Sequence, residues 1–399
     1  ALAAIPSTYG IPTPNDSRSL ALGVSALERF LAAYPAHPRA VRAAFEIGQA
    51  NMNAGQADAA LAAFARFLKG EGFKAESDEA KKELAQLAMT ATFLSGQILL
   101  GQGKFDEAVA AWQGYLAKFP DGPQGADAQR AILDARLAKA VDLVRLGRAG
   151  DARAVWAEFV AQNPLDPRVP EVLFQSGQSH LPDKQFDQAV AAWAALISKF
   201  PETEPAAHAQ FLTGTIQEVE KGTLAEAVET YKKIKAQPWA NEAAQRIAAM
   251  EAKALTVVTP RAFRSGEGPS LKVSTRNLER LTFTAYKLNA ESYFRKNHGF
   301  ENVESLDIGL VAPDAEWTED VPGFARLKPV EADYALKKLD VPGVYVVKVT
   351  DQKTLQATTL VVASDLDAIV KTSRDQVLVF AQDMATGKEQ SMTVTGGSA

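Results

Sequence analysis

The chain has no cysteine, which excludes disulfides, thiolate nucleophiles and cysteine-ligated metals. Its four histidines, at positions 37, 180, 208 and 298, are scattered and none is spaced as a paired metal ligand, so we expect no metal and no cofactor. It also lacks a run of lysine and arginine, and its formal net charge is −5 at pH 7. This balance argues against nucleic acid or an anionic membrane as a partner.

Long apolar runs and catalytic motifs are missing as well. No apolar stretch approaches the roughly 18–20 residues that span a bilayer, so the sequence predicts no transmembrane segment. Gly266-Glu267-Gly268 is followed by neither a helix nor Lys-Ser/Thr, which makes it a turn and not a phosphate loop. The pair Glu319-Asp320 has no apolar setting that would raise a carboxyl pKa. Because no serine or histidine sits in a nucleophile-elbow context either, we expect the protein not to be an enzyme.

What the chain does contain is a repeat. Between residues 40 and 238 a two-helix pattern recurs five times, and its first helix carries a small residue: Gly48, Gly96, Ala140, Gly177 and Gly214. An alanine follows twelve residues later in the first four copies and thirteen later in the fifth, at Ala60, Ala108, Ala152, Ala189 and Ala227. An aromatic comes four residues after each alanine: Phe64, Trp112, Trp156, Trp193 and Tyr231. The extra residue of the fifth copy is expected in its turn, at Lys221-Gly222.

A two-helix unit that cannot bury its own apolar face must stack on its neighbours, so residues 1–252 are expected to form an α-solenoid. The small residues should let the two helices approach closely, while the aromatic fills the space beside the crossing. Prolines close the units, as at Pro120 and Pro201, because proline ends helices. Bulky residues near the end of the second helix, such as Phe67 and Tyr115, should alter the packing between units.

These spacings resemble the tetratricopeptide family. The resemblance implies a surface lined by first-helix residues that binds a protein or peptide: Phe45, Gln49, Phe93, Gln97, Phe174, Gln178, Phe211 and Thr215. A row of phenylalanine and glutamine could hold an extended peptide through apolar contacts and amide hydrogen bonds. The alternative is that the phenylalanines simply pack between helices, as aromatics at helical spacing usually do.

The pattern changes near residue 253, where short runs of alternating hydrophobicity begin. Period-two alternation with intervening turn residues predicts an antiparallel β-sandwich over residues 253–365, with one short helix near 290–296. Within it, Pro342-Gly343-Val344-Tyr345 is typical of a tyrosine corner. Residues 366–399 are expected to start a second sandwich. Since too few residues remain to complete it, the sequence suggests the front of a longer protein.

The back half resembles the macroglobulin-like domains of bacterial alpha-2-macroglobulins. The resemblance is carried by Phe263-Arg264-Ser265-Gly266-Glu267, residues 271–277 and 342–345, Ile369 to Thr372, and Leu378 to Lys388. It implies a protein that traps proteases with a bait segment and a Cys–Gln thioester. That thioester cannot form in a chain without cysteine, and Ser265 and Glu389 depart from the family's pattern.

Two functions remain open on this basis. The fold expected for both is a multidomain α-then-β chain: a tetratricopeptide-like solenoid, a macroglobulin-like sandwich and the start of a second. In the first, the chain is the scaffold and docking segment of an alpha-2-macroglobulin-like protease inhibitor, with a protease as a partner. In the second, it is a cell-envelope adaptor whose repeats bind a peptide or protein. Ala1-Leu2-Ala3 resembles the end of an export signal, which favours a periplasmic or extracellular location, or it marks only an arbitrary boundary. The sequence leaves the oligomeric state open.

Overall fold

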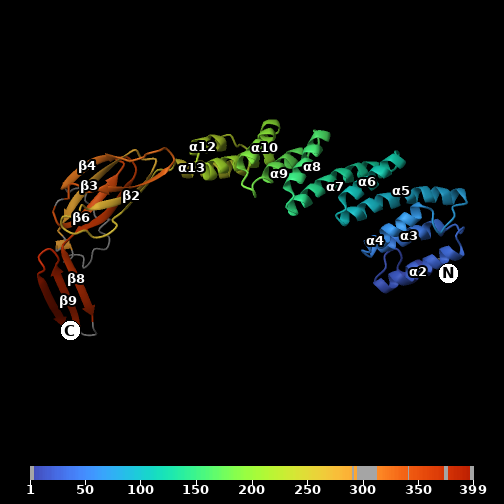
Figure 1. Ribbon diagram of the computed structural model, residues 1–399, viewed down its shortest axis with the longest axis horizontal. Coiled ribbons are helices and arrows are strands. Elements are labelled where there is room, and N and C mark those ends of the chain that lie inside the picture. The colour runs from blue at the N-terminus through green and yellow to red at the C-terminus, as the bar shows by residue number, and fades with distance from the viewer. Residues whose placement is uncertain (1–3, 290–291, 294–311, 340, 373–375, 396–399) are drawn as a thin grey trace. The chain divides into compact units, whose positions relative to one another are not determined.

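The structure, a computed structural model, describes residues 4–289, 292–293, 312–339, 341–372 and 376–395 (Figure 1). The chain divides into two compact units, Ala1–Ala209 and Gln210–Ala399. Helices occupy the first unit and the start of the second: α1 (Ala4–Tyr9), α2 (Ser17–Ala33), α3 (Ala40–Asn53), α4 (Ala57–Leu68), α5 (Asp78–Gly101), α6 (Phe105–Lys118), α7 (Gly125–Arg145), α8 (Ala149–Gln162), α9 (Val169–Gln178), α10 (Phe186–Lys199), α11 (Glu204–Thr215), α12 (Leu224–Lys232) and α13 (Trp239–Glu251). The five predicted copies are the helix pairs from α3–α4 to α11–α12.

The turn inside each hairpin has the same construction. In α3–α4 the amide of Gln56 donates to the carbonyl of Asn51, and Gly55 between them has a φ of 73°. This is the helix end in which a left-handed residue lets the following amide reach back to an otherwise unpaired carbonyl. The fourth hairpin places Lys184 at this position, with a φ of 55°, where the first three have glycine.

The extra residue of the fifth copy lies in the first helix and not in the turn. Residues Ile216–Glu220 form a π-helical turn, and the amide of Lys221 bonds to the carbonyl of Ile216. The left-handed residue, Gly222, therefore comes one position later than in the other hairpins. The predicted position at Lys221-Gly222 was wrong because a π turn, which is rare, accommodates the extra residue inside the first helix before the connection begins.

Four of the five hairpins are held by an aromatic ring lying directly on a glycine of the first helix, and the third has Ala140 in place of the glycine. A methyl group placed on Gly96 would lie 2.5 Å from the indole of Trp112, and one on Gly177 would lie 2.2 Å from that of Trp193. Phe64 lies on Gly48 and Tyr231 on Gly214 in the same way. Both indoles also donate from Nε1 to a first-helix carbonyl, over 3.1 Å from Trp112 to Phe93 and 3.0 Å from Trp193 to Phe174. The sequence spacing between the small residue and the aromatic thus corresponds to a direct contact between them in the structure.

The second-helix alanines are fully buried. Ala60, Ala108, Ala152, Ala189 and Ala227 each have 0% exposure. We expect Ala108→Leu to force the hairpin apart and to cost about 1–3 kcal/mol of stability, because an interior packed to this density has no room for three more carbons. Urea denaturation measures the cost, and an unchanged midpoint would contradict this account.

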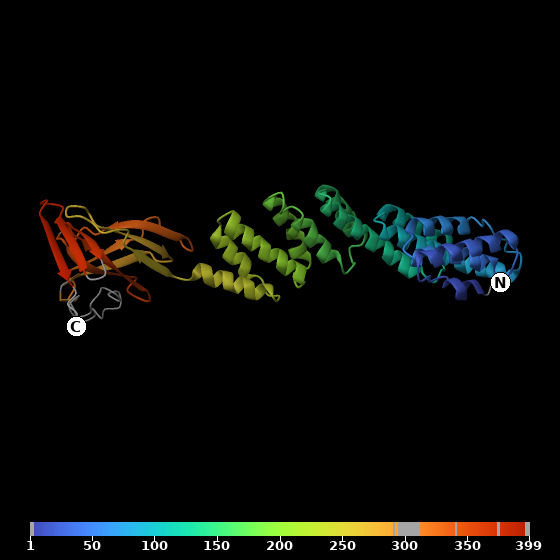
Figure 2. The same cartoon turned by 90° about the horizontal axis from the view of Figure 1, so that it is seen from below.

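After α13 the described chain is mainly β-structure, drawn as arrows in Figure 1 and Figure 2, and its named strands pair antiparallel. Its strands are β1 (Ala254–Val258), β2 (Ser270–Arg276), β3 (Arg280–Leu288), β4 (Ala315–Asp320), β5 (Pro329–Ala335), β6 (Gly343–Thr350), β7 (Gln356–Ala363), β8 (Leu366–Thr372), β9 (Gln376–Asp383) and β10 (Glu389–Thr395). They form sheets in the order β1-β2-β5, β4-β3-β6-β7 and β10-β9-β8. The first two sheets share one core, in which Leu271 and Val273 meet Phe283 and Val347. Helical repeats followed by antiparallel sheets are therefore confirmed.

Two finer expectations have different outcomes. The hydroxyl of Tyr345 donates to the carbonyl of Val341 over 2.6 Å, which is the bond expected of a tyrosine corner. The short helix predicted near 290–296 falls almost wholly outside the described residues.

The third sheet, β10-β9-β8, leaves three apolar side chains, Leu366, Ile369 and Val370, more than half exposed.

Candidate protein-binding surface

The predicted binding residues divide into two groups, and the phenylalanines pack against rings of their own hairpins, with Phe93 and Phe211 partly exposed and the other two buried. Phe45 and Phe174 are only 3% and 5% exposed. Phe45 packs on Phe64 with ring centroids 5.5 Å apart, and Phe174 stacks on Trp193 at 6.1 Å. Phe93 and Phe211 contact their own second-helix aromatics, Trp112 and Tyr231. These rings bind neighbouring helices, as the packing alternative expected, so they support a surface without forming it.

The glutamines one turn further along lie at the surface. Gln97 is exposed, and Gln49 and Gln178 are partly exposed. Within the described residues no hydrogen bond from these three side chains is found, whereas Gln102 donates to Asp58, and Gln175 to Glu171. Since they occupy the same position in three copies of one repeat, they lie on the same side of their helices. We call Gln49, Gln97 and Gln178 the amide row.

The remaining copies depart from this row. Thr215 in the fifth copy is engaged, because its hydroxyl bonds to the carbonyl of Phe211 and lies 3.2 Å from the hydroxyl of Tyr231. In the third copy the corresponding residue is Val141, which is 62% exposed. Sequence reasoning passed over Val141 because it followed the glutamines alone, although the repeat register identifies the position. Along the first four copies this position therefore carries two amides, the apolar side chain of Val141 and a third amide.

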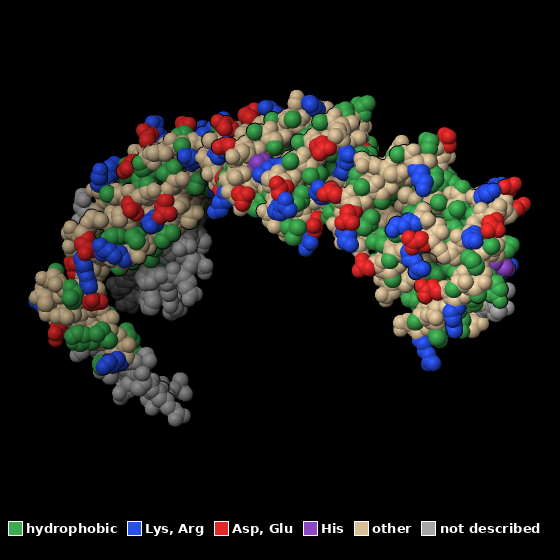
Figure 3. All heavy atoms as spheres, turned by 45° about the vertical axis from the view of Figure 1, so that its right-hand side comes forward, with side chains coloured by type: hydrophobic (Ala, Val, Ile, Leu, Met, Phe, Trp, Pro, Cys, Tyr) green, Lys and Arg blue, Asp and Glu red, His purple; other side chains and the backbone are tan. Residues whose placement is uncertain are grey.

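Charged side chains of the helices that carry the amide row, and of their neighbours, form ion pairs between helices. Arg42 on α3 pairs with Glu83 on α5 at 2.7 Å, and Lys139 on α7 with Asp106 on α6 at 2.7 Å. Burial raises the pKa of Glu46, which lies one turn from Arg42. Figure 3 shows acidic and basic side chains interspersed over the visible face of the helical part, without a large patch of either sign. On this face no charge of one sign predominates.

One helix of the repeats has a second property. By length and composition alone, α5 could cross a membrane, and it is the one such helix among the described residues. The sequence prediction of no such segment overlooked it because charges in its first turns interrupt the apolar run. One helix of this kind is weak evidence, and α5 packs on α6 through Gly96 and Trp112 as the first helix of a hairpin.

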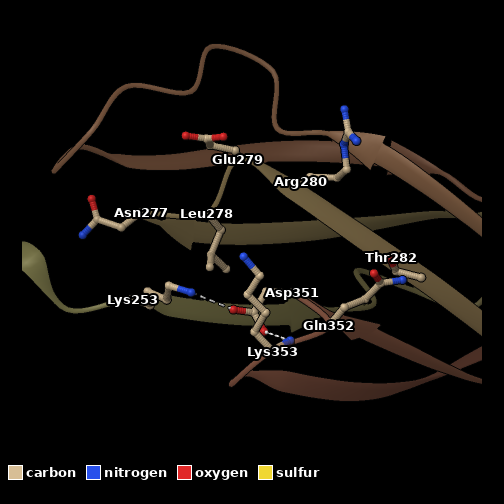
Figure 4. A pocket seen from close by; sticks show the side chains of 9 residues that line it. All are labelled: Lys253, Asn277, Leu278, Glu279, Arg280, Thr282, Asp351, Gln352 and Lys353. Atoms are coloured by element: carbon tan, nitrogen blue, oxygen red, sulfur yellow. Dashed lines mark hydrogen bonds and ion pairs between the residues drawn. The ribbon is translucent and has the colours of Figure 1, made fainter.

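The sandwich offers a pocket of about 410 Å³ beside the end of α13, lined by Lys253, Asn277, Leu278, Glu279, Arg280, Thr282, Asp351, Gln352 and Lys353 (Figure 4). Its buried carboxylate, Asp351, accepts hydrogen bonds from the amides of Lys353, Thr354 and Leu355 and from Lys253 Nζ at 3.0 Å. Arg280 pairs with Asp320. Asp351 and Arg280 thus already have partners within the protein, and the hydrogen bonds to Asp351 stabilise the β6–β7 turn. Among the described residues no cluster of acidic or histidine side chains could hold a metal ion.

Comparison with known proteins places the helical part. A model of the tetratricopeptide repeat matches residues 16–80, 48–123, 93–139 and 174–242. No curated protein matches the chain. Among solved structures, native alpha-2-macroglobulin from Escherichia coli spanning domains NIE-MG1 is 17% identical, with 35% of this chain and 74% of that chain covered and a TM-score of 0.28.

Two other solved structures match about half of this chain. MamA from Desulfovibrio magneticus RS-1 is 19% identical, with 49% of this chain and 92% of that chain covered and a TM-score of 0.26. YrrB, described as a TPR protein with an unusual peptide-binding site, is 19% identical, with 51% and 91% covered and a TM-score of 0.26. At these scores we base nothing further on the likeness. The matched residues and the hairpin geometry agree, and the helical part of this chain carries tetratricopeptide repeats, which form protein-binding scaffolds.

Proposed function

We propose that the protein is a non-enzymatic adaptor whose repeats bind an extended segment of a partner protein along the amide row. The observation that carries this proposal is the set of three equivalent, solvent-accessible amides without a hydrogen-bond partner among the described residues. Helix packing explains the apolar residue at the phenylalanine position, but it gives no reason for an amide one turn later. An extended backbone presents alternating donors and acceptors, which a row of amides can match.

The buried phenylalanines have a supporting role in this proposal. Because Phe45 and Phe174 are fixed against second-helix rings, the helix turns that follow them are held in one orientation. Gln49 and Gln178 therefore start from backbones that do not rearrange on binding. Exposed Val141 adds an apolar contact between the second and fourth copies, so we expect partners with an apolar side chain among polar ones.

The test is a triple replacement, Gln49→Ala, Gln97→Ala and Gln178→Ala, in the full chain. Extended peptides selected from a display library provide the ligand, and calorimetry measures their affinity. We expect affinity to fall about tenfold or more, the equivalent of one to two net hydrogen bonds. The fold should be retained, because exposed helix positions tolerate alanine.

A matched control replaces three exposed glutamines elsewhere in the same unit, Gln113, Gln129 and Gln188, with alanine. This variant also loses three side-chain amides, but none of the amide row, and it should bind the peptides as the unchanged chain does. Equal affinity of both triple variants, with circular dichroism confirming their helices, would show that the amide row does not bind peptides. The phenylalanine positions would then have packing roles only.

The protease-trapping role expected from the macroglobulin resemblance gains no separate support from the described residues. The repeats would provide a binding scaffold for either function. Because protein binding is the part that the repeats support, we propose the adaptor. An exported, cell-envelope location remains part of this proposal as a prediction, tested by fractionating cells that express the protein.

A further inference from the structure

The last helix, α13, enters the sandwich through an unusually short connection. Only Ala252 and Lys253 lie between the end of α13 at Glu251 and the start of β1 at Ala254. Neither residue is glycine, and Ala252 is already extended, with a ψ of 133°. Both α13 and the sandwich belong to the same compact unit.

The C-terminal carbonyls of α13 are bonded by the sandwich. The last carbonyls of a helix have no partners within the helix. Here Arg276 Nη1 donates to the carbonyl of Ala249 over 2.7 Å. Asn277 Nδ2 donates to the carbonyls of Met250 and Ala252, over 2.8 and 3.0 Å. A guanidinium and an amide donor at this end also complement the negative pole of the helix dipole.

Asn277 connects the helix to a second loop at the same time. Its Oδ1 accepts a hydrogen bond from the amide of Leu327 over 2.7 Å, and Leu327 lies in the loop between β4 and β5. Asn277 and Leu327 both have left-handed backbones, with φ of 56° and 71°. This conformation is tolerable for asparagine and costly for leucine, so it requires a fixed surrounding structure. One side chain thus ties the helix end to two loops.

A third loop completes the attachment. Lys253, in the connection itself, pairs with the buried Asp351 of the β6–β7 turn, as the dashed line in Figure 4 shows. In the β4–β5 loop, Arg326 Nη2 lies 3.8 Å from Oε1 of Glu251, the last residue of α13. The helix end is therefore bonded to three separate turns of the sandwich.

We propose that Asn277 is a lock that makes α13 and the sandwich one rigid body, so that a movement of the sandwich carries α13 with it. The lock does not depend on what the amide row binds. Loss of its side-chain amide removes the bonds to the carbonyls of Met250 and Ala252 and the link to the β4–β5 loop, and it loosens the attachment without unfolding either part, because neither core contains Asn277.

The test measures one distance in the full chain. Since the chain has no cysteine, spin labels can be attached at Gln245→Cys on α13 and Ser274→Cys on β2, two exposed positions. Pulsed electron resonance should give a narrow distance distribution. Asn277→Gly keeps the left-handed backbone and removes only the side chain, and it should broaden that distribution. In the same variant the amide of Leu327 should exchange its hydrogen about fivefold faster, as expected for one lost hydrogen bond.

Two further variants make the result specific. Asn277→Asp keeps the acceptor for Leu327 but sets a carboxylate against two carbonyl oxygens, so it should broaden the distance while leaving that amide protected. Gln352→Gly is the matched control, because Gln352 is also left-handed, with a φ of 58°, and its side chain bonds to no residue of α13 among those described. It should leave the distribution narrow. A distribution already broad in the unchanged chain, or one equally narrow in Asn277→Gly, would overturn the proposal.

Discussion

Gly96→Ala is expected to destabilise the second hairpin by about 3 kcal/mol, at the upper end of the usual cost of overpacking. The added methyl would lie 2.5 Å from Cε2 and Nε1 of Trp112. Trp112 is fully buried, so the indole can move away only by breaking its bond to the carbonyl of Phe93. Alanine's better helix propensity returns only about 1 kcal/mol.

Gly114→Ala is the matched control in the same hairpin. Gly114 lies in α6, and a methyl there would meet no atom within 4 Å. This variant should be more stable than the unchanged chain by about 0.5–1 kcal/mol, because only the helix propensity changes. Urea denaturation of both variants gives shifts of opposite sign if the ring contact is the cause, and shifts of the same sign would refute it.

A double-mutant cycle isolates the contact further. In a chain that already carries Trp112→Ala, the methyl of Gly96→Ala has no ring to meet. The cost of the glycine replacement should then disappear, which appears as a coupling energy of about 2–3 kcal/mol. Independent effects of the two changes would mean that the methyl is accommodated elsewhere.

Asp351→Asn is expected to destabilise the sandwich by about 2–3 kcal/mol, since hydrogen bonds to a charged group are worth more than neutral ones. Burial alone would raise the pKa of Asp351, but the amides of Leu355, Thr354 and Lys353, together with Lys253, outweigh it and hold the pKa well below its usual range. The side chain is only 4% exposed, so solvent screens these bonds little.

The direction of the pH dependence follows from the depressed pKa. A carboxyl whose folded pKa is lowered contributes its full stability above the unfolded pKa, about 3.9, and loses it as the pH falls below that value. The unchanged chain should therefore lose more stability between pH 6 and pH 3 than Asp351→Asn does. Asp383→Asn is the comparison: hydrogen bonds from the amides of Thr386 and Ala385 also lower the pKa of Asp383, but this residue is partly exposed, so its replacement should reduce the pH dependence less than Asp351→Asn does. Parallel pH curves for the unchanged chain and Asp351→Asn would contradict this account.

The hairpins could be predicted because their signals are local. A small residue and an aromatic at fixed spacing report one contact within about sixteen residues, and the structure shows that contact at Gly48, Gly96, Gly177 and Gly214. Strand alternation is equally local, which is why the sheets were also predicted. The side of the helix on which Phe45 lies could not be decided in this way, because both a buried and a surface position fit helical periodicity.

Long-range features were out of reach of sequence reasoning. Asn277 bonds to carbonyls 25 and 27 positions earlier in the chain and to an amide 50 positions later. Nothing in its neighbouring residues indicates these partners. The π turn at 216–220 was detectable only as one surplus residue, since spacing records how many residues are inserted but not where. Of the predicted binding residues, Gln97 is exposed, Gln49, Gln178, Phe93 and Phe211 are partly exposed, and Phe45 and Phe174 are buried.

The placement of a ring on a glycine of its own hairpin, seen in four of the five copies, has an evolutionary consequence. Trp112 and Gly96 travel together when a hairpin is duplicated or deleted in a gene, as do Trp193 and Gly177. A copied hairpin therefore arrives with its principal packing contact already complete, and only the stacking face between neighbours has to adapt. Lineages can lengthen or shorten such an array by whole hairpins, while a substitution at one member of a ring–glycine pair selects for change at the other.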